Sequence, residues 1–219
     1  MTDAPQIPPQ RREPLFNAPW TVLALIGLLV GAHALRLVLR LPPDPFAFAG
    51  DELSKGHWLG LLSYQLVHAS WPHVLMNSAA VLAFGPPTAR LFGAGPRGAG
   101  AFFAFFLVCG VIAALGYTAL NSHDGLVGAS GAASGLMGAA ARLIDGHGRV
   151  GRLTGPTVIG MTAAWIIVNA LLGLSGLTPG SAGLPVAWQA HIIGYFAGLL
   201  LIGAFARAAG ASGDHAIAP

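Results

Sequence analysis

Residues 98–120 read GAGAFFAFFLVCGVIAALGYTAL, a run of 23 residues without a charged side chain. A helix rises 1.5 Å per residue, so about 20 apolar residues are needed to cross a hydrocarbon core roughly 30 Å thick. In lipid, every backbone polar group must be satisfied within the protein, which leaves helices and closed barrels as the only spanning structures. The alternating pattern of a barrel strand, about ten residues long, is absent from this run. The sequence therefore predicts a membrane-spanning helix here.

The composition of the whole chain agrees with that run. Of the 219 residues, 54% are hydrophobic and 9% are charged, whereas soluble domains carry about 25% charged residues. This composition excludes a soluble enzyme. Lysine occurs once, at Lys55, and the net charge is only +3, so the chain has no basic stripe of the kind that binds nucleic acid. The single cysteine, Cys109, can form neither an intrachain disulfide nor a cysteine-based metal cluster. We expect a multi-pass membrane protein that lies in the lipid bilayer.

Five further stretches have the length and apolar character of membrane spans. Each is bounded by Pro, Gly or charged residues of the kind that end helices. The six predicted spans are residues 20–41, 72–92, 98–120, 126–143, 154–174 and 186–206. We therefore expect an all-α membrane protein, a bundle of six transmembrane helices in one domain over residues 19–207. Residues 1–18, which contain four prolines, are expected to be a flexible cytoplasmic tail, and residues 208–219 a short cytoplasmic tail.

Basic residues predict the orientation of these spans, because cytoplasmic loops carry the excess of Lys and Arg. An even number of spans puts both chain ends on one side, and eight arginines fall on that side: Arg11, Arg12, Arg90, Arg97, Arg142, Arg149, Arg152 and Arg207. The opposite side holds Arg36, Arg40 and Lys55. Eight basic residues against three predict that both termini are cytoplasmic.

The beginning of the chain has a second interpretation. Arg11 and Arg12, the apolar run from Trp20 and the tripeptide Ala32-His33-Ala34 are similar to a signal peptide with its cleavage site. Apolar residues continue to Leu41, beyond the usual apolar region of about 7–15 residues, so a retained span is favoured.

Residues 42–71 form the longest predicted connection on the outer side. They mix apolar and charged side chains in a pattern too broken to span a membrane. Two interpretations stay open: the segment lies in the membrane interface with aromatic residues at headgroup level, or it is an ordinary loop.

Carboxylates are missing from all six predicted spans. No Asp or Glu occurs between Glu52 and Asp124, and none between Asp145 and Asp214. This excludes an aspartyl dyad and the HExxH zinc helix with its glutamate base. It also argues against a proton relay that depends on carboxylates.

Histidine, serine and asparagine are the polar residues left for chemistry inside the spans. His73 and Asn77 are four residues apart at the start of the second span, so they share one helix face. Ser130 lies in Gly-Ala-Ser-Gly at the start of the fourth span, and His191 lies about six residues into the sixth. All four are predicted at similar depth on the outer side. Polar residues are costly in a bilayer, so this conjunction of a hydroxyl, an imidazole and an oxyanion-stabilising pair indicates a functional site.

Small residues favour close approach of the fourth and sixth spans. His191, Gly194 and Gly198 recur along one helix face, and Ser130, Ser134 and Gly138 form a similar stripe. If the stripes face each other, Ser130 and His191 come within hydrogen-bonding reach, which is the geometry that an activated serine requires.

Three segments in this order resemble the rhomboid family of intramembrane serine proteases. They are HASWPHVLMN at residues 68–77, GASG at residues 128–131, and AHIIG at residues 190–194 followed by Gly198. The resemblance covers the six-span core.

The resemblance implies an intramembrane serine endopeptidase that hydrolyses peptide bonds in or near transmembrane segments of other membrane proteins. It implies Ser130 as the nucleophile and His191 as its base, with His73, Asn77 and the Ser130 backbone N–H as the oxyanion hole. It implies no cofactor and no metal, and a structural role for His68. We expect a multi-pass protein of a bacterial inner membrane whose active site opens to the outer face.

Two positions depart from the family pattern. The family often has Trp-Arg in the first outer loop, where this chain has Trp58-Leu59-Gly60, so the arginine is missing at Gly60. It also often has a glutamate after the second span, where this chain has Ala89. These departures bear on loop anchoring and stability rather than on the chemistry.

Other interpretations concern the function and the histidine. A non-catalytic rhomboid-like protein that binds transmembrane helices would be expected to lack the serine or the histidine. A small transporter lined by Ser130, Asn77 and Asn169 would be expected to show paired broken helices, and none is evident. The Asn169 side chain is interpreted as forming a hydrogen bond between helices. Asp124, in an outer loop, is disfavoured as a third catalytic member, so packing or a neutral hydrogen bond must hold the imidazole.

Overall fold

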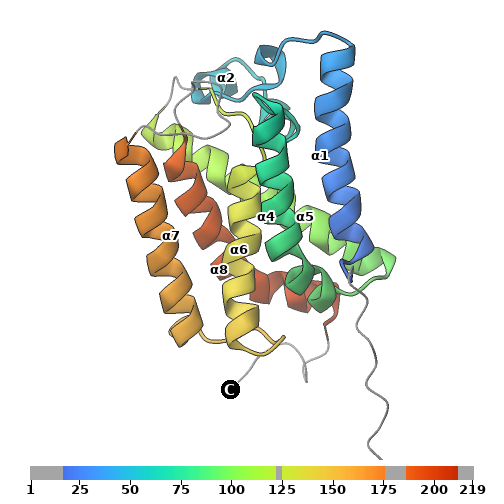
Figure 1. Ribbon diagram of the computed structural model, residues 1–219, viewed down its shortest axis with the longest axis vertical. Coiled ribbons are helices and arrows are strands. Elements are labelled where there is room, and N and C mark those ends of the chain that lie inside the picture. Colours follow the sequence, from blue (N-terminus) through green and yellow to red (C-terminus); the bar gives the residue numbers. More distant parts are fainter. Residues whose placement is uncertain (1–16, 122–124, 176–185, 212–219) are drawn as a thin grey trace, which may run out of the picture.

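The computed structural model describes residues 17–121, 125–175 and 186–211, and the regular structure within them is helical (Figure 1). The six longest helices are α1 (Trp20–Val38), α4 (Trp71–Phe92), α5 (Pro96–Leu120), α6 (Ser130–Asp145), α7 (Pro156–Ser175) and α8 (Trp188–Ala209). Each overlaps one of the six stretches predicted from the sequence, which confirms an all-helical fold for the described part of the chain. The predicted N-terminal tail up to residue 16 and the C-terminal tail from residue 212 lie outside the described residues.

Four of these helices, α1, α5, α7 and α8, are long and apolar enough to cross a membrane. They make the chain an integral multi-pass membrane protein. The helices α4 and α6 do not meet that test, and α6 has only 16 residues. The count of six spans therefore stays a prediction.

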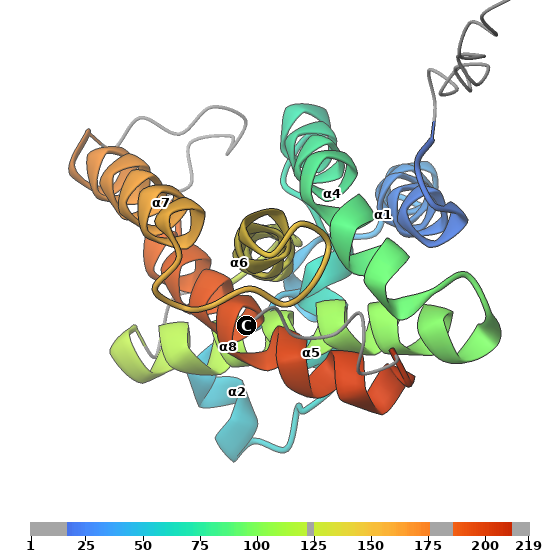
Figure 2. The same ribbon diagram turned by 90° about the horizontal axis from the view of Figure 1, so that it is seen from below.

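The short helix α6 lies at the centre of the bundle, with α4, α5, α7 and α8 around it. The helix α1 packs against α4, on the side of α4 away from α6 (Figure 2). Eleven of its 16 residues are buried, and most of these are Ala and Gly. Small side chains let neighbouring backbones approach closely in a membrane, where packing rather than the hydrophobic effect holds helices together. The composition of α6 thus explains how four helices can surround it.

Glycines bring α6 and α8 into backbone contact. A Cβ atom on Gly194 would collide with the carbonyl oxygen of Gly131, and one on Gly198 with that of Gly135. On the α6 side, Gly138 meets the backbone of Tyr195 in the same way. The predicted approach of the two helices is confirmed, although Gly131 and Gly135 make the closest contacts on α6 rather than the serines next to them.

The beginning of α6 differs from the prediction. The fourth span was expected from residue 126, but the helix begins at Ser130. Leu126 instead exchanges two backbone hydrogen bonds with Phe48, at 2.7 and 3.0 Å, and Gly128 has a φ of 105°. A helix cannot include a residue with that φ, so α6 starts only after Gly128.

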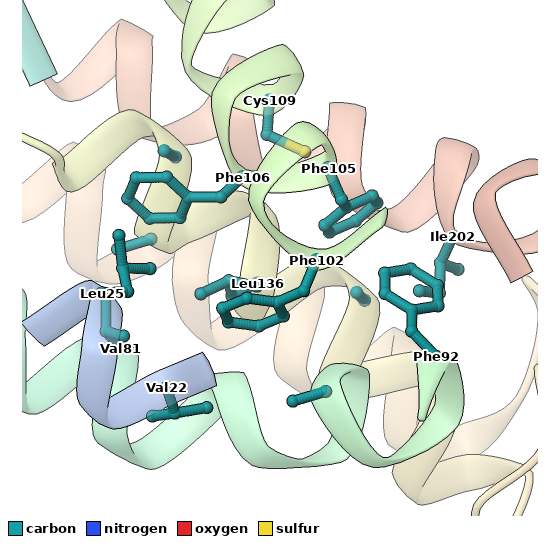
Figure 3. Close-up of a cluster of buried hydrophobic side chains, with 14 of the residues drawn as sticks. Val22, Leu25, Val81, Phe92, Phe102, Phe105, Phe106, Cys109, Leu136 and Ile202 are labelled. Atoms are coloured by element: carbon teal, nitrogen blue, oxygen red, sulfur yellow. The ribbon is translucent and has the colours of Figure 1, made fainter. Parts of the chain in front are cut away.

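A cluster of buried side chains from five helices forms the main core (Figure 3). Phe102 and Phe106 of α5 lie against Val22 of α1, Val81 of α4 and Leu136 of α6, among others. This core fixes α6 against its neighbours. In contrast, only 11% of the apolar window of α7 is buried, compared with 50% for α5, so α7 is held by far fewer contacts.

The connection between α1 and α4 packs onto the bundle in short helical turns: η1 (Asp44–Phe46), α2 (Gly50–Ser54), α3 (Gly60–Ser63) and η2 (Tyr64–Leu66). Phe48 and Tyr64 are buried in a second cluster with side chains of α5 and Ala190 of α8. The Tyr64 hydroxyl donates to the Gly110 carbonyl at 2.7 Å. The connection does not span, as predicted, and it covers the end of the bundle at which α6 and α8 begin.

Arg36 of α1 holds both ends of this connection by hydrogen bonds. Its guanidinium donates to the carbonyls of Leu41 and His68, at 3.0 and 3.1 Å. The arginine missing at Gly60 had put the anchoring of the connection in question. Arg36 supplies an arginine anchor from a different element.

Candidate active site

Ser130 and His191 meet where α6 and α8 begin. Ser130 is the first residue of α6, and His191 lies in the first turn of α8. The Ser130 Oγ and His191 Nε2 atoms are 2.9 Å apart, a hydrogen-bond distance. The contact depends on the glycines described above, because Gly131 and Gly194 set the separation of the two helices next to these side chains. The structure thus brings together the two residues that were predicted as nucleophile and base.

A third residue holds the histidine from its other side. The Asn169 Oδ1 atom of α7 lies 2.8 Å from His191 Nδ1, and the Asn169 side chain is fully buried. The Asn169 Nδ2 atom donates to the Trp165 carbonyl at 2.9 Å, which leaves Oδ1 as the acceptor facing the imidazole. The network therefore assigns the proton to His191 Nδ1 and leaves the Nε2 lone pair to accept from the Ser130 hydroxyl. This is the tautomer that a general base acting through Nε2 requires.

Trp165, also on α7, lies beside the same imidazole. Its ring centroid is 6.2 Å from that of His191, with the two planes tilted by 36°. Its indole N–H donates to the His191 carbonyl at 3.4 Å. One helix thus fixes both the ring and the backbone of this histidine.

His73 and Asn77 lie close to the segment that leads into α6. The Ser70 side chain caps α4 by accepting from the His73 backbone N–H at 3.3 Å. A Cβ on Gly128 would lie 2.7 Å from the His73 ring and 3.4 Å from Asn77 Nδ2. Gly128 precedes Ser130 by two residues, so both side chains adjoin the start of α6. The absence of a side chain at Gly128 makes this approach feasible.

Asn77 offers a donor that is not in use. Its Nδ2 atom is buried and has no hydrogen-bond partner within the described residues. Buried polar groups are nearly always paired, and exceptions occur at catalytic sites. The first backbone N–H groups of a helix also lack intrahelical acceptors, and Ser130 occupies that position in α6. The site therefore collects donors that could serve a developing negative charge.

His68 packs against His73 and precedes α4, so it lies outside the spans. The two rings are 5.1 Å apart, and the His68 side chain is fully buried. Burial lowers the pKa of His68 to about 3, with a further contribution from the neighbouring His73 and His33 rings. His68 therefore stays uncharged at neutral pH, and it contributes packing beside His73 rather than charge.

Asp124, the carboxylate weighed earlier, lies outside the described residues. Within the described part of the chain, no group of three His, Cys, Asp or Glu side chains is placed to hold a metal ion. Among the described residues, the site contains a serine, an imidazole and the donors of His73 and Asn77. Sequence reasoning did not include Asn169 in the site, and its only signal was an amide within an otherwise apolar helix.

Comparison with known proteins identifies the family of this chain. A family model described as Rhomboid domain matches residues 55–208. The chain is also 32% identical over 104 residues to RHOMBOID-like protein 9, chloroplastic, of Arabidopsis thaliana. That similarity covers 47% of this chain and 22% of the plant protein, so this chain corresponds to only about a fifth of the length of that relative. Because the family model covers well over half of the 219 residues, the chain belongs to the rhomboid family.

Proposed function

We propose that this protein is an intramembrane serine endopeptidase, with Ser130 as the nucleophile and His191 as the general base. One observation carries the proposal: the Ser130 hydroxyl bonds to His191 Nε2, while Asn169 accepts from His191 Nδ1. Rhomboid proteins include non-catalytic members, and such a member has no need of a serine aligned with a correctly protonated imidazole.

The proposed reaction proceeds in two halves. His191 Nε2 takes the Ser130 proton as Oγ attacks the peptide carbonyl, and the resulting imidazolium gives that proton to the leaving amine as the C–N bond breaks. A water molecule then attacks the acyl-enzyme with His191 again as base, which releases the acid and regenerates Ser130. Asn169 orients the ring throughout with an amide oxygen, in place of the carboxylate of a charged triad.

The oxyanion would be stabilised by neutral donors. The Ser130 backbone N–H is at the start of α6, where the helix dipole favours negative charge, and Asn77 Nδ2 and the His73 imidazole of α4 adjoin Gly128, two residues earlier. Donors that are already in place before the reaction need no reorganisation as charge develops.

The distribution of arginines supports the orientation that we propose, with six spans and both termini in the cytoplasm. Arg90, Arg142 and Arg207 lie near the ends of α4, α6 and α8, far from the helix starts that carry the site. With that end in the cytoplasm, Ser130 and His191 open to the outer face. A bacterial inner membrane remains our prediction, and the plant relative is a chloroplast protein.

Labelling by a fluorophosphonate in mild detergent tests whether the serine is activated. We expect the protein to react at Ser130 and the label to be located there by peptide mass spectrometry. A folded protein that does not react, and that retains bound transmembrane peptides instead, would favour the non-catalytic helix-binding role.

Substitution of Asn77 by alanine should slow cleavage without abolishing it. Loss of one oxyanion donor costs roughly 10²–10³ in rate in a soluble serine protease, and two other donors remain here. We expect a fall in kcat of about 10²-fold, measured with a single-span substrate in proteoliposomes.

Ser78→Ala is the matched control for Asn77→Ala. Ser78 is the next residue of α4, is also buried, and donates only to the Val74 carbonyl of its own helix at 2.8 Å. Equal rates for the two variants would remove Asn77 from the oxyanion hole.

Substrates are proposed to be transmembrane segments with weak helices. A helix hides its scissile bonds within its own hydrogen bonds, so Gly, Pro or Ser in the outer leaflet should expose them, and we expect a small residue near the cut. A panel of single-span substrates measures this preference. Equal cleavage of a poly-Leu span and a span containing Gly and Pro would contradict it.

A further inference from the structure

A cavity lies at the end of the bundle opposite to Ser130 and His191. Its volume is about 800 Å³, and it is formed by the last turns of α4 and α6, the loop after α6, and Gly210 and Ala211 after α8. Figure 2 views the molecule from this end. Small-molecule sites in proteins usually measure about 300–1,000 Å³, so the cavity is large enough for a ligand.

The lining of this cavity combines cationic and apolar groups. Arg90 and Arg149 line it together with His147, and none of the described residues that line it carries a carboxylate. Leu91 and Ile144 contribute apolar walls next to these basic side chains. Such a combination complements a molecule that carries a phosphate at one end and hydrocarbon at the other.

The two arginines have bonding capacity to spare. Arg149 has no side-chain partner within the described part of the chain, and Arg90 uses only Nη2, which donates to the Asn17 carbonyl at 2.8 Å. Other arginines at this end are occupied: Arg97 donates twice to the Ala208 carbonyl, and Arg142 donates to Gly151 and Leu199. The acceptors are the Ala208 and Leu199 carbonyls of α8 and the Gly151 carbonyl of the loop after α6. Arg90 and Arg149 are both exposed, and the donors that they do not use within the described part of the chain are available to a ligand in the cavity.

We propose that this cavity binds the headgroup phosphate of an anionic phospholipid. The planar guanidinium groups of Arg90 and Arg149 match phosphate oxygens, and basic pockets between membrane helices are typical sites for acidic headgroups. The apolar walls formed by Leu91 and Ile144 would receive the first part of the acyl chains. The site is separate from Ser130 and His191 and does not depend on the proposed peptidase activity.

Two other occupants would be excluded by experiment. One is soluble inorganic phosphate, which shares the headgroup chemistry but not the hydrocarbon. The other is the C-terminal segment of the chain, because Ala211 lines the cavity and Asp214 follows three residues later.

Native mass spectrometry of the full-length protein, with phosphatidylglycerol and phosphatidylcholine added in turn, tests the proposal. The double variant Arg90→Gln/Arg149→Gln is compared with the wild type and with Arg152→Gln. Arg152 is a matched control, because it is exposed, lies three residues from Arg149 and does not line the cavity. Circular dichroism checks that each variant is folded.

We expect the wild type and Arg152→Gln to retain phosphatidylglycerol in preference to phosphatidylcholine. We assign to each of the two lining arginines the roughly fivefold contribution to affinity of a basic residue next to anionic lipid, so the double variant should retain the lipid roughly 25-fold more weakly. Excess inorganic phosphate should leave the retained lipid in place.

Three results would overturn the proposal. The first is an equal loss of lipid in Arg152→Gln, which would indicate a general charge effect. The second is displacement by inorganic phosphate, which would indicate a soluble anion. The third is lipid binding that appears only after deletion of residues 212–219, which would show that the C-terminal segment occupies the cavity.

Discussion

Ser130→Ala is expected to abolish cleavage of a single-span substrate and labelling by a fluorophosphonate, while the protein stays folded. The substitution removes the only hydroxyl within hydrogen-bond distance of His191 Nε2 among the described residues. The remaining oxyanion donors cannot form an acyl-enzyme without a nucleophile. Removing the serine of a soluble protease lowers kcat by about 10⁶-fold, and the same loss here would bring cleavage below detection. The measurement is product formation in proteoliposomes, with circular dichroism to verify the helical content.

Ser134→Ala is the matched control for this variant. Ser134 lies one turn further along α6, is buried, and donates to the Ser130 carbonyl at 2.7 Å. It therefore shares the helix, the residue type and the burial, but not the contact with the imidazole. We expect its cleavage rate to stay near that of the wild type. Wild-type cleavage by Ser130→Ala would refute the proposed mechanism, whatever the control shows.

Asn169→Leu is expected to lower kcat by about 10³-fold with little change in KM. Without the amide oxygen, His191 Nδ1 loses its acceptor, and nothing keeps the proton on that nitrogen rather than on Nε2. A wrong tautomer costs about 10⁴-fold in a charged triad, and the neutral acceptor here should be worth somewhat less. The measurements are steady-state rates and the ¹⁵N spectrum of the histidine, in which wild-type His191 should carry its proton at Nδ1.

Two further variants separate orientation of the ring from simple packing of α7. Asn169→Asp keeps an acceptor oxygen at the same distance, so it should recover most of the lost activity. Trp165→Phe keeps an aromatic ring beside His191 and removes only the bond to its carbonyl, so we expect a small effect. If Asn169→Leu retains the wild-type rate and tautomer, Asn169 is only a contact between helices. Such a result would leave the Ser130–His191 proposal intact.

The positions of the long helices could be predicted from the sequence because membrane helices obey two strong constraints. Each must be apolar over its length, and each must end where Pro, Gly or charge permits. The start of α6 could not be predicted in this way. Residues 126–129 are apolar enough for a helix, and only the structure shows that Leu126 pairs with Phe48 and that Gly128 has a φ of 105°. The sequence contains no sign of that pairing, because its two partners are far apart in the chain.

The candidate site was predictable where spacing along a helix determines geometry. His73 and Asn77 share a face at i and i+4, and glycines on α6 and α8 indicate a close approach. The prediction that Asn169 forms a hydrogen bond between helices was correct, but its partner, His191, could not be predicted. The rotation and tilt of α7 decide whether an amide faces lipid, a backbone carbonyl or an imidazole, and periodicity does not determine them for so apolar a helix.

Because α7 is sparsely packed, the catalytic activity of this protein and its thermal stability need not change together. Most of the bundle is held by α4, α5, α6 and α8, whereas α7 buries 11% of its apolar window and yet carries both side chains that position His191. A detergent that competes for the lipid-facing surface of α7 would disturb the imidazole long before the core melts. Preparations of this protein should therefore contain a fraction that is folded and monodisperse but inactive. Specific activity, rather than thermal stability, is the better guide for choosing a detergent.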